Sequence, residues 1–538
     1  MTGQEEPSLQ YDVVVVGGGP AGLAAAIHLK QQALAGGRDC SVCLLEKGVS
    51  IGAHVLSGAI LDPVSLDELL PDWRQRGAPV GVQVADHHMF YLSKMGSVSL
   101  PIPPRLQHDG HWIVRLGELC RWMAVQAEGL GVDLLPGFPA AAPLWGDSGG
   151  LAGVVTGDMG LDKQGKPTAS YQPGVAIYAR QTILAEGCRG HLTRQIMNKF
   201  SLNQHSQPQC YSLGIKELWR VNPAAHHLGQ VVHTLGWPLT GQAFGGGFLY
   251  HDQDNRVAVG LLVGLDYANP WLSPFEEFQK FKTHPLIASV LAGGERLAYG
   301  ARSLTEGGWQ ALPRLAFPGG VLAGDGAGFL DASRMMGIHT AMKSGMCAAR
   351  VVYDRLLGEN KPERHWQQSW LWRDLFLARN SRPAFRWGEL AGMVYNGLDS
   401  FLLKGNAPWT LSLPASSCNL QPARGFSQIP YGQPDGLLTF DRASSLALAH
   451  INHREEQPVH IPIQDADILV SRNYETWGAP ENRYCPGGVF DLAKRQDGSV
   501  TLRIQAANCL HCKTCDILND ALLWTTPEGG SGPRYGGM

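Results

Sequence analysis

Three cysteines near the C-terminal end of the sequence are spaced as metal ligands. Cys509, Cys512 and Cys515 form a C-x2-C-x2-C run, with which bacterial ferredoxins begin their cluster-binding pattern. That pattern would place a fourth cysteine at position 519, where this chain has Asn519. Cys485 is the best substitute, because it keeps the Cys-Pro dipeptide of the pattern. The sequence therefore predicts one [4Fe–4S] cluster on these four cysteines.

Structural zinc is the alternative for these thiols, although zinc sites usually pair two C-x2-C arms. The chain has 11 cysteines and no secretory signal, so a disulfide framework is not expected. We expect the other seven to be packing residues: Cys40, Cys43, Cys120, Cys188, Cys210, Cys347 and Cys418.

A glycine-rich loop near the start of the chain has the spacing of a dinucleotide site. Gly17, Gly19 and Gly22 form G-x-G-x-x-G between an apolar run at 11–16 and an Ala/Leu-rich stretch. The first glycine permits a tight turn, the second admits a pyrophosphate, and the third lets the helix pack closely on the strand. Glu46 ends the next apolar run, where its carboxylate can accept hydrogen bonds from a ribose.

A second contact far along the chain favours FAD over a nicotinamide nucleotide. Gly324 and Asp325 follow an apolar run and precede a predicted helix at 337–357, so Asp325 can bind the ribityl hydroxyls. The N-terminus of this helix can stabilise negative charge on a flavin, and Thr340 in its first turn can tune the flavin by hydrogen bonding. No second convincing G-x-G-x-x-G motif is present, which weakens an NAD(P)H-dependent reading.

The elements that must position these residues are strands alternating with helices at each end of a β-like region. Strands at 11–16, 42–45, 176–185 and 320–324 and helices at 23–35 and 337–357 predict an α/β Rossmann-like domain. This domain is expected at 8–205 and 300–382, interleaved with a β-rich domain at 206–299 and 383–434. The cysteine-bearing tail, 435–538, is predicted to be ferredoxin-like.

The amino-acid composition argues against binding of nucleic acid and against a membrane-spanning segment. Only 17% of the 538 residues are charged, against about 25% in an average soluble protein. The net charge of -3 gives no electrostatic footprint for nucleic acid, and no apolar run is long enough to span a membrane. The polar N-terminus shows neither a secretory signal nor a transit peptide.

Two apolar stretches are candidates for a surface that faces lipid or quinone. In 383–404, Leu390, Val394, Leu398 and Phe401 fall on one helical face. The other stretch is 51–70. Periodicity alone favours ordinary core for both stretches, whereas the glycine content and the uncharged run 221–251 favour a surface that faces lipid or quinone.

The order of these motifs resembles the electron-transfer flavoprotein–ubiquinone oxidoreductase family from Tyr11 to Met538. The resemblance rests on the glycine loop, then GWPL, FGGGFLYH, GLDYANP, AMKSG, CPGGVF, NCLHCKTCDI and PEGGSGPRYGGM. It implies FAD, one [4Fe–4S] cluster, electron-transfer flavoprotein as donor and ubiquinone as acceptor.

The resemblance also implies positions. Gly245 and Gly246 would lie at the quinone, and 51–72 and 383–404 would dip into the bilayer. Without a transit peptide, the chain would be a bacterial form, peripheral on the cytoplasmic face of the inner membrane. The family's CPAGVY has tyrosine where this chain has Phe490, so one hydrogen bond near the cluster would be missing.

Two alternatives remain from the sequence. One is a flavin-dependent isoprenoid reductase, of the geranylgeranyl type, with a fused ferredoxin domain. The other is a zinc-bearing docking module on a degenerate nucleotide fold.

Overall fold

The chain opens with the expected strand–loop–helix–strand unit. The computed structural model describes residues 8–56, 60–359, 362–494 and 500–538. The first sheet has the order β19-β20-β13-β1-β2-β8, and its central strands are parallel, so the loops after them meet at one edge. Its strands are β1 (Ser8–Val16), β2 (Val42–Glu46), β8 (Val132–Pro136), β13 (Ala176–Leu184), β19 (Ala316–Phe317) and β20 (Gly320–Leu322). In addition, β10 (Leu151–Thr156) pairs with β13, and β9 (Ala140–Trp145) pairs with β10.

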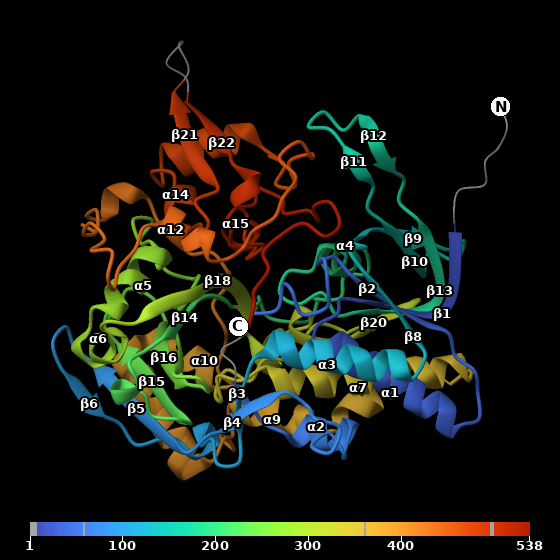
Figure 1. Ribbon diagram of the computed structural model, residues 1–538, viewed down its shortest axis with the longest axis horizontal. Helices are drawn as coiled ribbons and strands as arrows, with labels where there is room; N and C mark the ends of the chain where they lie inside the picture. Colours follow the sequence, from blue (N-terminus) through green and yellow to red (C-terminus); the bar gives the residue numbers. More distant parts are fainter. Residues whose placement is uncertain (1–7, 57–59, 360–361, 495–499) are drawn as a thin grey trace.

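Two long helices pack on this sheet and on each other. In α1 (Pro20–Ala35) and α7 (Ile338–Leu356), most residues that face the sheet are fully buried. The helices approach closely at Gly345, where a Cβ atom would lie 2.1 Å from the carbonyl oxygen of Ala21. α3 (Leu116–Gly129) lies beside α1 in the same layer (Figure 1).

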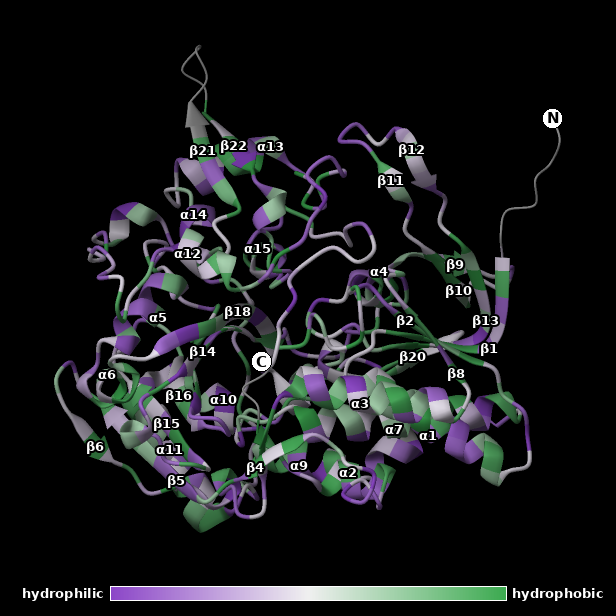
Figure 2. Cartoon of the chain, viewed as in Figure 1, coloured by the Kyte–Doolittle hydropathy of each residue, from purple (hydrophilic) through white to green (hydrophobic). Residues whose placement is uncertain are grey.

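The second sheet has seven strands in the order β18-β14-β17-β16-β15-β5-β6. Alternate residues of its strands pack in one apolar core with α5 (Pro274–Lys282) and α6 (Pro285–Leu291). Along these strands hydrophobic and hydrophilic residues are interspersed (Figure 2). Its members are β5 (Asp86–Leu92), β6 (Ser97–Ser99), β14 (Tyr211–Arg220), β15 (Gln230–Gly236), β16 (Gly245–His251), β17 (Arg256–Gly264) and β18 (Glu295–Thr305).

The boundaries expected for this domain need correction. Strands β5 and β6 lie within 8–205, which was assigned to the first domain, yet they extend the second sheet through parallel pairing of β5 with β15. β18 also continues to Thr305, past the expected boundary at 299. The residues of a polar, His-rich strand such as β5 do not indicate which of the two sheets the strand joins.

The C-terminal unit lies over β18, above the second sheet in Figure 1. It contains β21 (Phe490–Lys494), β22 (Val500–Ile504), α14 (Glu481–Tyr484) and α15 (Thr514–Leu518). The Tyr299 hydroxyl of β18 donates to the carbonyl of Pro486 at 3.1 Å. The tail then returns toward the first domain, and the N–H of Tyr535 donates to the carbonyl of Ala53 at 2.9 Å.

Shorter elements complete the fold. Among the helices in the described part of the chain, none is long and apolar enough to cross a membrane. These elements are β3 (Ile60–Leu61), α2 (Val64–Leu69), β4 (Val80–Gln83), β7 (Trp112–Val114), β11 (Met159–Leu161), β12 (Pro167–Gln172), α4 (His191–Lys199), α5 (Pro274–Lys282), α6 (Pro285–Leu291), α8 (Pro362–Gln367), α9 (Trp370–Ala378), α10 (Ser381–Ala384), α11 (Glu389–Leu398), α12 (Arg442–Ala447) and α13 (Ala466–Ile468).

Candidate functional site

One continuous cavity connects the predicted sites. It begins at the glycine loop after β1, passes Gly324 and Asp325, and ends against the second sheet. At that far end its wall includes Gly245 and Gly246, and Lys513 of the cysteine loop lines it from the C-terminal unit. Residues as far apart in the sequence as Gly17 and Lys513 therefore share one wall.

The glycine loop has the geometry expected for a pyrophosphate. Gly17 has a φ of 110°, and a Cβ there would lie 2.4 Å from the carbonyl oxygen of Ala185. A Cβ at Gly22 would lie 1.9 Å from the carbonyl oxygen of Gly17, so strand and helix pack too closely for a side chain. At Gly19, in contrast, a Cβ would meet nothing within 4 Å. The space at Gly19, directly before the N-terminus of α1, is therefore left for a ligand.

Glu46 is fixed at the end of β2. Its two carboxylate oxygens accept the N–H groups of Gly18 at 3.0 Å and Gly48 at 2.7 Å. Glu46 also lines the cavity. Each oxygen keeps a further lone pair, which suits the hydroxyls of a ribose.

Asp325 lies in the turn after β20, as predicted. Its carboxylate accepts the backbone N–H of Thr305 at 3.2 Å and also the Thr305 hydroxyl. Burial raises the pKa of Asp325, while the two Thr305 donors and the nearby Arg302 oppose that rise. Gly324 has a φ of 68°, and a Cβ there would lie 2.8 Å from that of Ala21, so the turn is held against α1.

The N-terminus of α7 faces the cavity, but Thr340 does not line it. Gly337, Ile338 and Ala341 are part of the wall. Thr340 is fully buried, and its hydroxyl donates to the Gly337 carbonyl of its own first turn at 3.0 Å. The structure therefore directs the helix end, rather than this hydroxyl, at the cavity.

Gly245 and Gly246 form the start of β16 at the other end of the cavity. Gly245 has a φ of 150°, and a Cβ there would lie 2.0 Å from the Leu262 carbonyl oxygen. A Cβ at Gly246 would lie 2.3 Å from the Thr234 carbonyl oxygen. Both glycines are therefore required by close backbone approach, and the cavity beside them is bounded by the backbone itself.

The structure brings the four predicted ligand cysteines together. Cys485, Cys509, Cys512 and Cys515 are all buried, with 5–9% exposed. Burial raises the pKa values of all four thiols, for Cys485 to about 11 and for Cys509 to about 12, and repulsion from neighbouring cysteines adds to the rise at Cys485, Cys509 and Cys515. A cationic iron–sulfur core offsets both effects, so this donor set fits a [4Fe–4S] cluster.

Hydrogen-bond donors already point at these sulfurs. The Val489 N–H lies 3.5 Å from Cys485 Sγ, and the His511 N–H lies 3.4 Å from Cys509 Sγ. The Thr514 hydroxyl lies 3.4 Å from Cys512 Sγ, as expected for the hydroxyl inside the loop. Such donors stabilise the negative charge of thiolate-bound clusters.

The cysteine loop also forms part of the cavity wall. The Lys513 Nζ donates to the carbonyls of Cys188 at 3.1 Å and Arg189 at 2.8 Å, and burial lowers its pKa to about 8. The carbonyl of Cys512 accepts the N–H of Ser303, another wall residue, at 3.3 Å. A single hydrogen bond therefore connects the predicted cluster ligand Cys512 to the cavity wall. The sequence did not predict this contact.

The cysteines expected to be packing residues are indeed in the interior. Six are buried and Cys418 is half-buried. Burial raises the pKa of each thiol, for example that of Cys43 to about 12, so these thiols stay protonated and unreactive.

The two apolar stretches, 383–404 and 51–72, differ in their exposure to solvent. On α11 and the turn after it, the apolar residues are solvent-exposed: Leu390 by 67%, Val394 by 65%, Leu398 by 50%, Phe401 by 44% and Leu402 by 72%. In the described part of 51–72, in contrast, the larger apolar residues are buried: Ile51, Ile60, Leu61, Leu66, Leu69 and Leu70. The prediction that this stretch faces lipid is therefore wrong for them, because they pack in the core of the first domain and its neighbour. Residues 57–59 lie outside the described residues.

Three family models match this chain. A model described as ETF-QO, ubiquinone-binding, covers residues 211–304. A model described as electron transfer flavoprotein-ubiquinone oxidoreductase, 4Fe-4S, covers 436–536, and an NAD(P)-binding Rossmann-like domain covers 15–71. These ranges correspond to the second sheet, the C-terminal unit and the opening strand–loop–helix.

Solved structures support the fold of the first two domains. A geranylgeranyl bacteriochlorophyll reductase-like protein from Thermoplasma acidophilum matches with a TM-score of 0.50 at 17% identity, covering 73% of this chain and 89% of that one. The flavin-dependent brominase Bmp2 matches with a TM-score of 0.51 at 13% identity, covering 74% and 92%. At such identities the likeness concerns the fold alone, and the isoprenoid reductase alternative is not favoured.

Relatives match over the whole chain. The electron transfer flavoprotein-ubiquinone oxidoreductase of Pseudomonas aeruginosa is 44% identical, over 99% of this chain and 100% of its own length. The mitochondrial enzyme of Homo sapiens is 45% identical, over 98% and 89%. The chain therefore belongs to the electron-transfer flavoprotein–ubiquinone oxidoreductase family, which transfers electrons from reduced electron-transfer flavoprotein through FAD and a [4Fe–4S] cluster to ubiquinone.

Proposed function

We propose that the quinone binds where the cavity meets β16 and that it enters from the surface formed by α11. The contact between two phenylalanines carries this proposal. Phe244 lines the cavity directly before Gly245, and its ring meets that of Phe385 edge to face at 4.8 Å. Phe385 lies in the short turn Phe385–Trp387 before α11 and packs against that helix, where a Cβ at Gly392 would lie 2.6 Å from the Phe385 ring, so the cavity wall continues into the exposed apolar helix.

The same surface is proposed to lie in one membrane leaflet, on the cytoplasmic side of the inner membrane. The exposed leucines of α11 are accompanied by Trp387 and Trp409, which are exposed by 49% and 46%. The Trp409 indole donates to the Tyr395 hydroxyl at 2.8 Å. Aromatic residues with a polar edge are typical of the headgroup level, and apolar residues on one side of a short helix suit the acyl boundary.

At the other end of the cavity, Gly17, Gly19 and Gly22 would hold the pyrophosphate of FAD, Glu46 its ribose and Asp325 its ribityl chain. FAD supplies a group that exchanges one or two electrons, which suits a chain joining a one-electron cluster to a two-electron quinone. The chain's own residues keep this site dry and orient the cofactor. Cys485, Cys509, Cys512 and Cys515 would hold the cluster.

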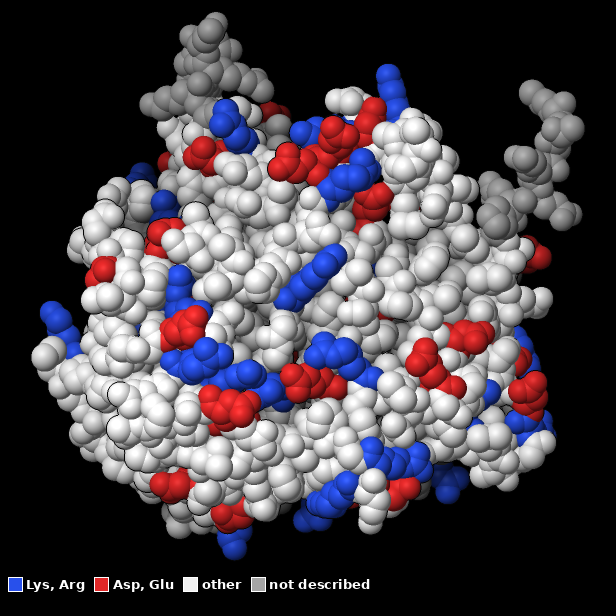
Figure 3. All heavy atoms as spheres, in the orientation of Figure 1, with Lys and Arg blue, Asp and Glu red and all other residues white. Residues whose placement is uncertain are grey.

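The donor flavoprotein is proposed to dock near the C-terminal unit, because the cluster thiols lie there. On the face shown in Figure 3, charged side chains of both signs are intermixed between large uncharged areas. Contacts of mixed charge give an orientation to a docking partner without a strong single-sign field.

Photolabelling with an azido-substituted ubiquinone tests the quinone position. The holoenzyme in liposomes is illuminated with the probe, digested, and the labelled peptides are sequenced. We expect label in 244–250 and in the α11 segment, and excess unlabelled ubiquinone should prevent it. Label confined to other peptides, with the same protection by ubiquinone, would place the quinone elsewhere and refute the proposal.

A further inference from the structure

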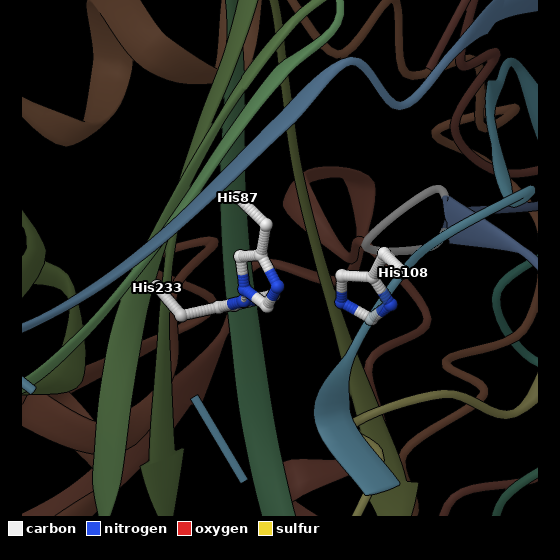
Figure 4. A group of neighbouring side chains, drawn as sticks. All are labelled: His87, His108 and His233. Atoms are coloured by element: carbon white, nitrogen blue, oxygen red, sulfur yellow. Dashed lines mark hydrogen bonds between the residues drawn. The ribbon is translucent and has the colours of Figure 1, made fainter. Parts of the chain in front are cut away.

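A row of polar side chains leads away from the proposed quinone position across three neighbouring strands. The Tyr250 hydroxyl on β16 lies 2.8 Å from His233 Nε2 on β15. His233 Nδ1 lies 2.9 Å from His87 Nε2 on β5. Figure 4 shows the imidazole of His87 between those of His233 and His108. These groups form a continuous hydrogen-bonded row, with both nitrogens of His233 engaged.

The sheet register explains why these side chains meet. Val231 pairs with Tyr250 on one side and with His87 on the other, so Tyr250 and His87 project to the same face of the sheet. His233 lies two residues after Val231 and shares that face. Gly246 lies on this face too, four residues before Tyr250, so the row and the glycine end of the cavity occupy one surface.

The inner end of the row reaches the cavity and the outer end approaches solvent. Tyr250 and His233 both line the cavity. At the outer end, the His108 ring stacks on that of His87 with centroids 4.5 Å apart, and residues 107, 109 and 110 around His108 are exposed. His108 Nδ1 also lies 3.1 Å from His111 Nδ1. The row therefore spans from the cavity to just beneath the surface.

Two ring nitrogens between the stacked histidines have no protein partner. His87 Nδ1 and His108 Nε2 are both buried without a hydrogen-bond partner among the described residues. Buried polar atoms of this kind are usually satisfied by an ordered water or an ion. A water at this point would join His108 to the rest of the row.

We propose that Tyr250, His233, His87 and His108 form a relay that carries protons from water to the reduced quinone. The proposal rests on the quinone position given above. It assigns a function to residues that the electron path does not use.

Each transfer in this relay balances. As a quinone carbonyl oxygen becomes a hydroxyl, its new O–H bond forms and the O–H bond of Tyr250 breaks. The tyrosine oxygen takes the proton from His233 Nε2, while His233 Nδ1 takes one from His87 Nε2. His87 is reprotonated at Nδ1 from the side of His108. The established activity supplies the two electrons for one quinol, and water supplies the two protons. One pass delivers one proton and leaves His233 and His87 protonated at Nδ1, so both imidazoles must return to the Nε2–H tautomer before the second pass.

The protonation states suit such a relay. Burial lowers the pKa of His233 to about 3 and that of His87 to about 4, and it also lowers the pKa of His108. Burial raises the pKa of Tyr250. All four groups are therefore neutral near pH 7, so each imidazole has one N–H to give and one lone pair to accept.

A metal ion is the competing occupant of the three histidines. Their ligand nitrogens lie within 4.8 Å of one another. However, the facing nitrogens of His233 and His87 already share a hydrogen bond, and the other nitrogen of His233 pairs with Tyr250. A metal would have to break this pairing, so the geometry favours the relay.

The test compares an acceptor that needs protons with one that does not. Holoenzyme reduced by electron-transfer flavoprotein is assayed with a ubiquinone analogue and, separately, with ferricyanide, which takes one electron and no proton. In Tyr250→Phe and His87→Gln, we expect quinone turnover to fall about 10- to 100-fold, within the range for lost proton transfer. Ferricyanide reduction should stay within about twofold, and the solvent deuterium isotope effect on quinone reduction should rise. The control is His88→Gln, because His88 is next to His87 but 40% exposed and paired with Asp86.

Three results would overturn the relay. Either both acceptors lose rate in parallel, which indicates a structural role, or quinone turnover is unchanged in the variants. A stoichiometric metal that is lost in His108→Gln would also overturn it, since a metal-bound imidazole cannot pass a proton. If photolabelling finds the quinone at 244–250 and the variants still behave as wild type, only the relay fails.

Discussion

The exposed leucines of α11 and of the turn after it, Asp399–Leu403, give the most direct test of membrane binding. Leu390 and Leu402 are exposed by 67% and 72%. Full burial of a leucine contributes about 1.5–3 kcal/mol, so inserting these exposed portions is worth about 1–2 kcal/mol for each side chain. Replacing both by glutamate removes roughly 2–4 kcal/mol, before any penalty for the charge itself. Since about 1.4 kcal/mol is tenfold, the partition coefficient should fall by at least 30-fold and by up to several hundredfold.

Co-sedimentation with liposomes measures this partition directly, with lipid concentration varied to give a binding curve. The matched control is Leu437→Glu, because Leu437 is 75% exposed on the C-terminal unit. A water-soluble short-chain quinone should be reduced at the normal rate by the double variant, whereas long-chain ubiquinone in liposomes should not. Equal partition of wild type and the double variant, or an equal loss in Leu437→Glu, would refute the assignment of this surface.

Three further predictions concern the cofactor sites. Gly19→Ala should fold normally but bind FAD about 30-fold more weakly, because the added methyl group fills the phosphate space and removes hydrogen bonds worth about 2 kcal/mol. Gly22→Ala should instead lower thermal stability, because its Cβ would lie 1.9 Å from a backbone oxygen. Flavin absorbance measures the first effect and melting curves measure the second. Cys485→Ser should abolish the reduced-cluster EPR signal and lower the iron content while FAD is retained, and an intact signal would exclude Cys485 as a ligand. Phe490 is buried near the cluster cysteines, and Phe490→Tyr should raise the reduction potential of the cluster. A new hydroxyl hydrogen bond that stabilises the reduced form by about 1 kcal/mol corresponds to a rise of roughly 40 mV. Potentiometry that shows no shift or a downward shift would contradict this prediction.

The parts of the candidate site whose geometry can be inferred from the sequence are those governed by local rules. Gly17, Gly19 and Gly22 follow a buried strand and open a helix, and the steric need for each glycine is a property of that turn alone. Cys509, Cys512 and Cys515 are likewise close in sequence. Such patterns carry their own geometry, so the fold around them can be inferred without knowledge of distant contacts.

The errors concern contacts between distant segments. The apolar periodicity of 51–72 and that of 383–404 are equivalent in the sequence, and only tertiary packing buries the first and exposes the second. His87 and His233 are 146 residues apart and meet because β5 pairs with β15, for which neither strand carries a local signal. Thr340 has the expected position in its helix, but the side chain turns to its own backbone.

The proposed quinone site has to satisfy two different requirements. The quinone needs an apolar entrance from lipid, whereas the protons for its reduction need a polar path from water. If the quinone enters beside Phe385, its ring arrives from lipid into a cavity walled by Phe244, Phe248 and glycine backbone. Phenylalanine rings and glycine offer no side-chain proton donor, yet a quinol needs two protons. A path for protons must therefore reach the quinone from a side other than its entrance. The row that ends at Tyr250 begins beneath an exposed loop, so one sheet would separate the lipid route of the quinone from the aqueous route of its protons.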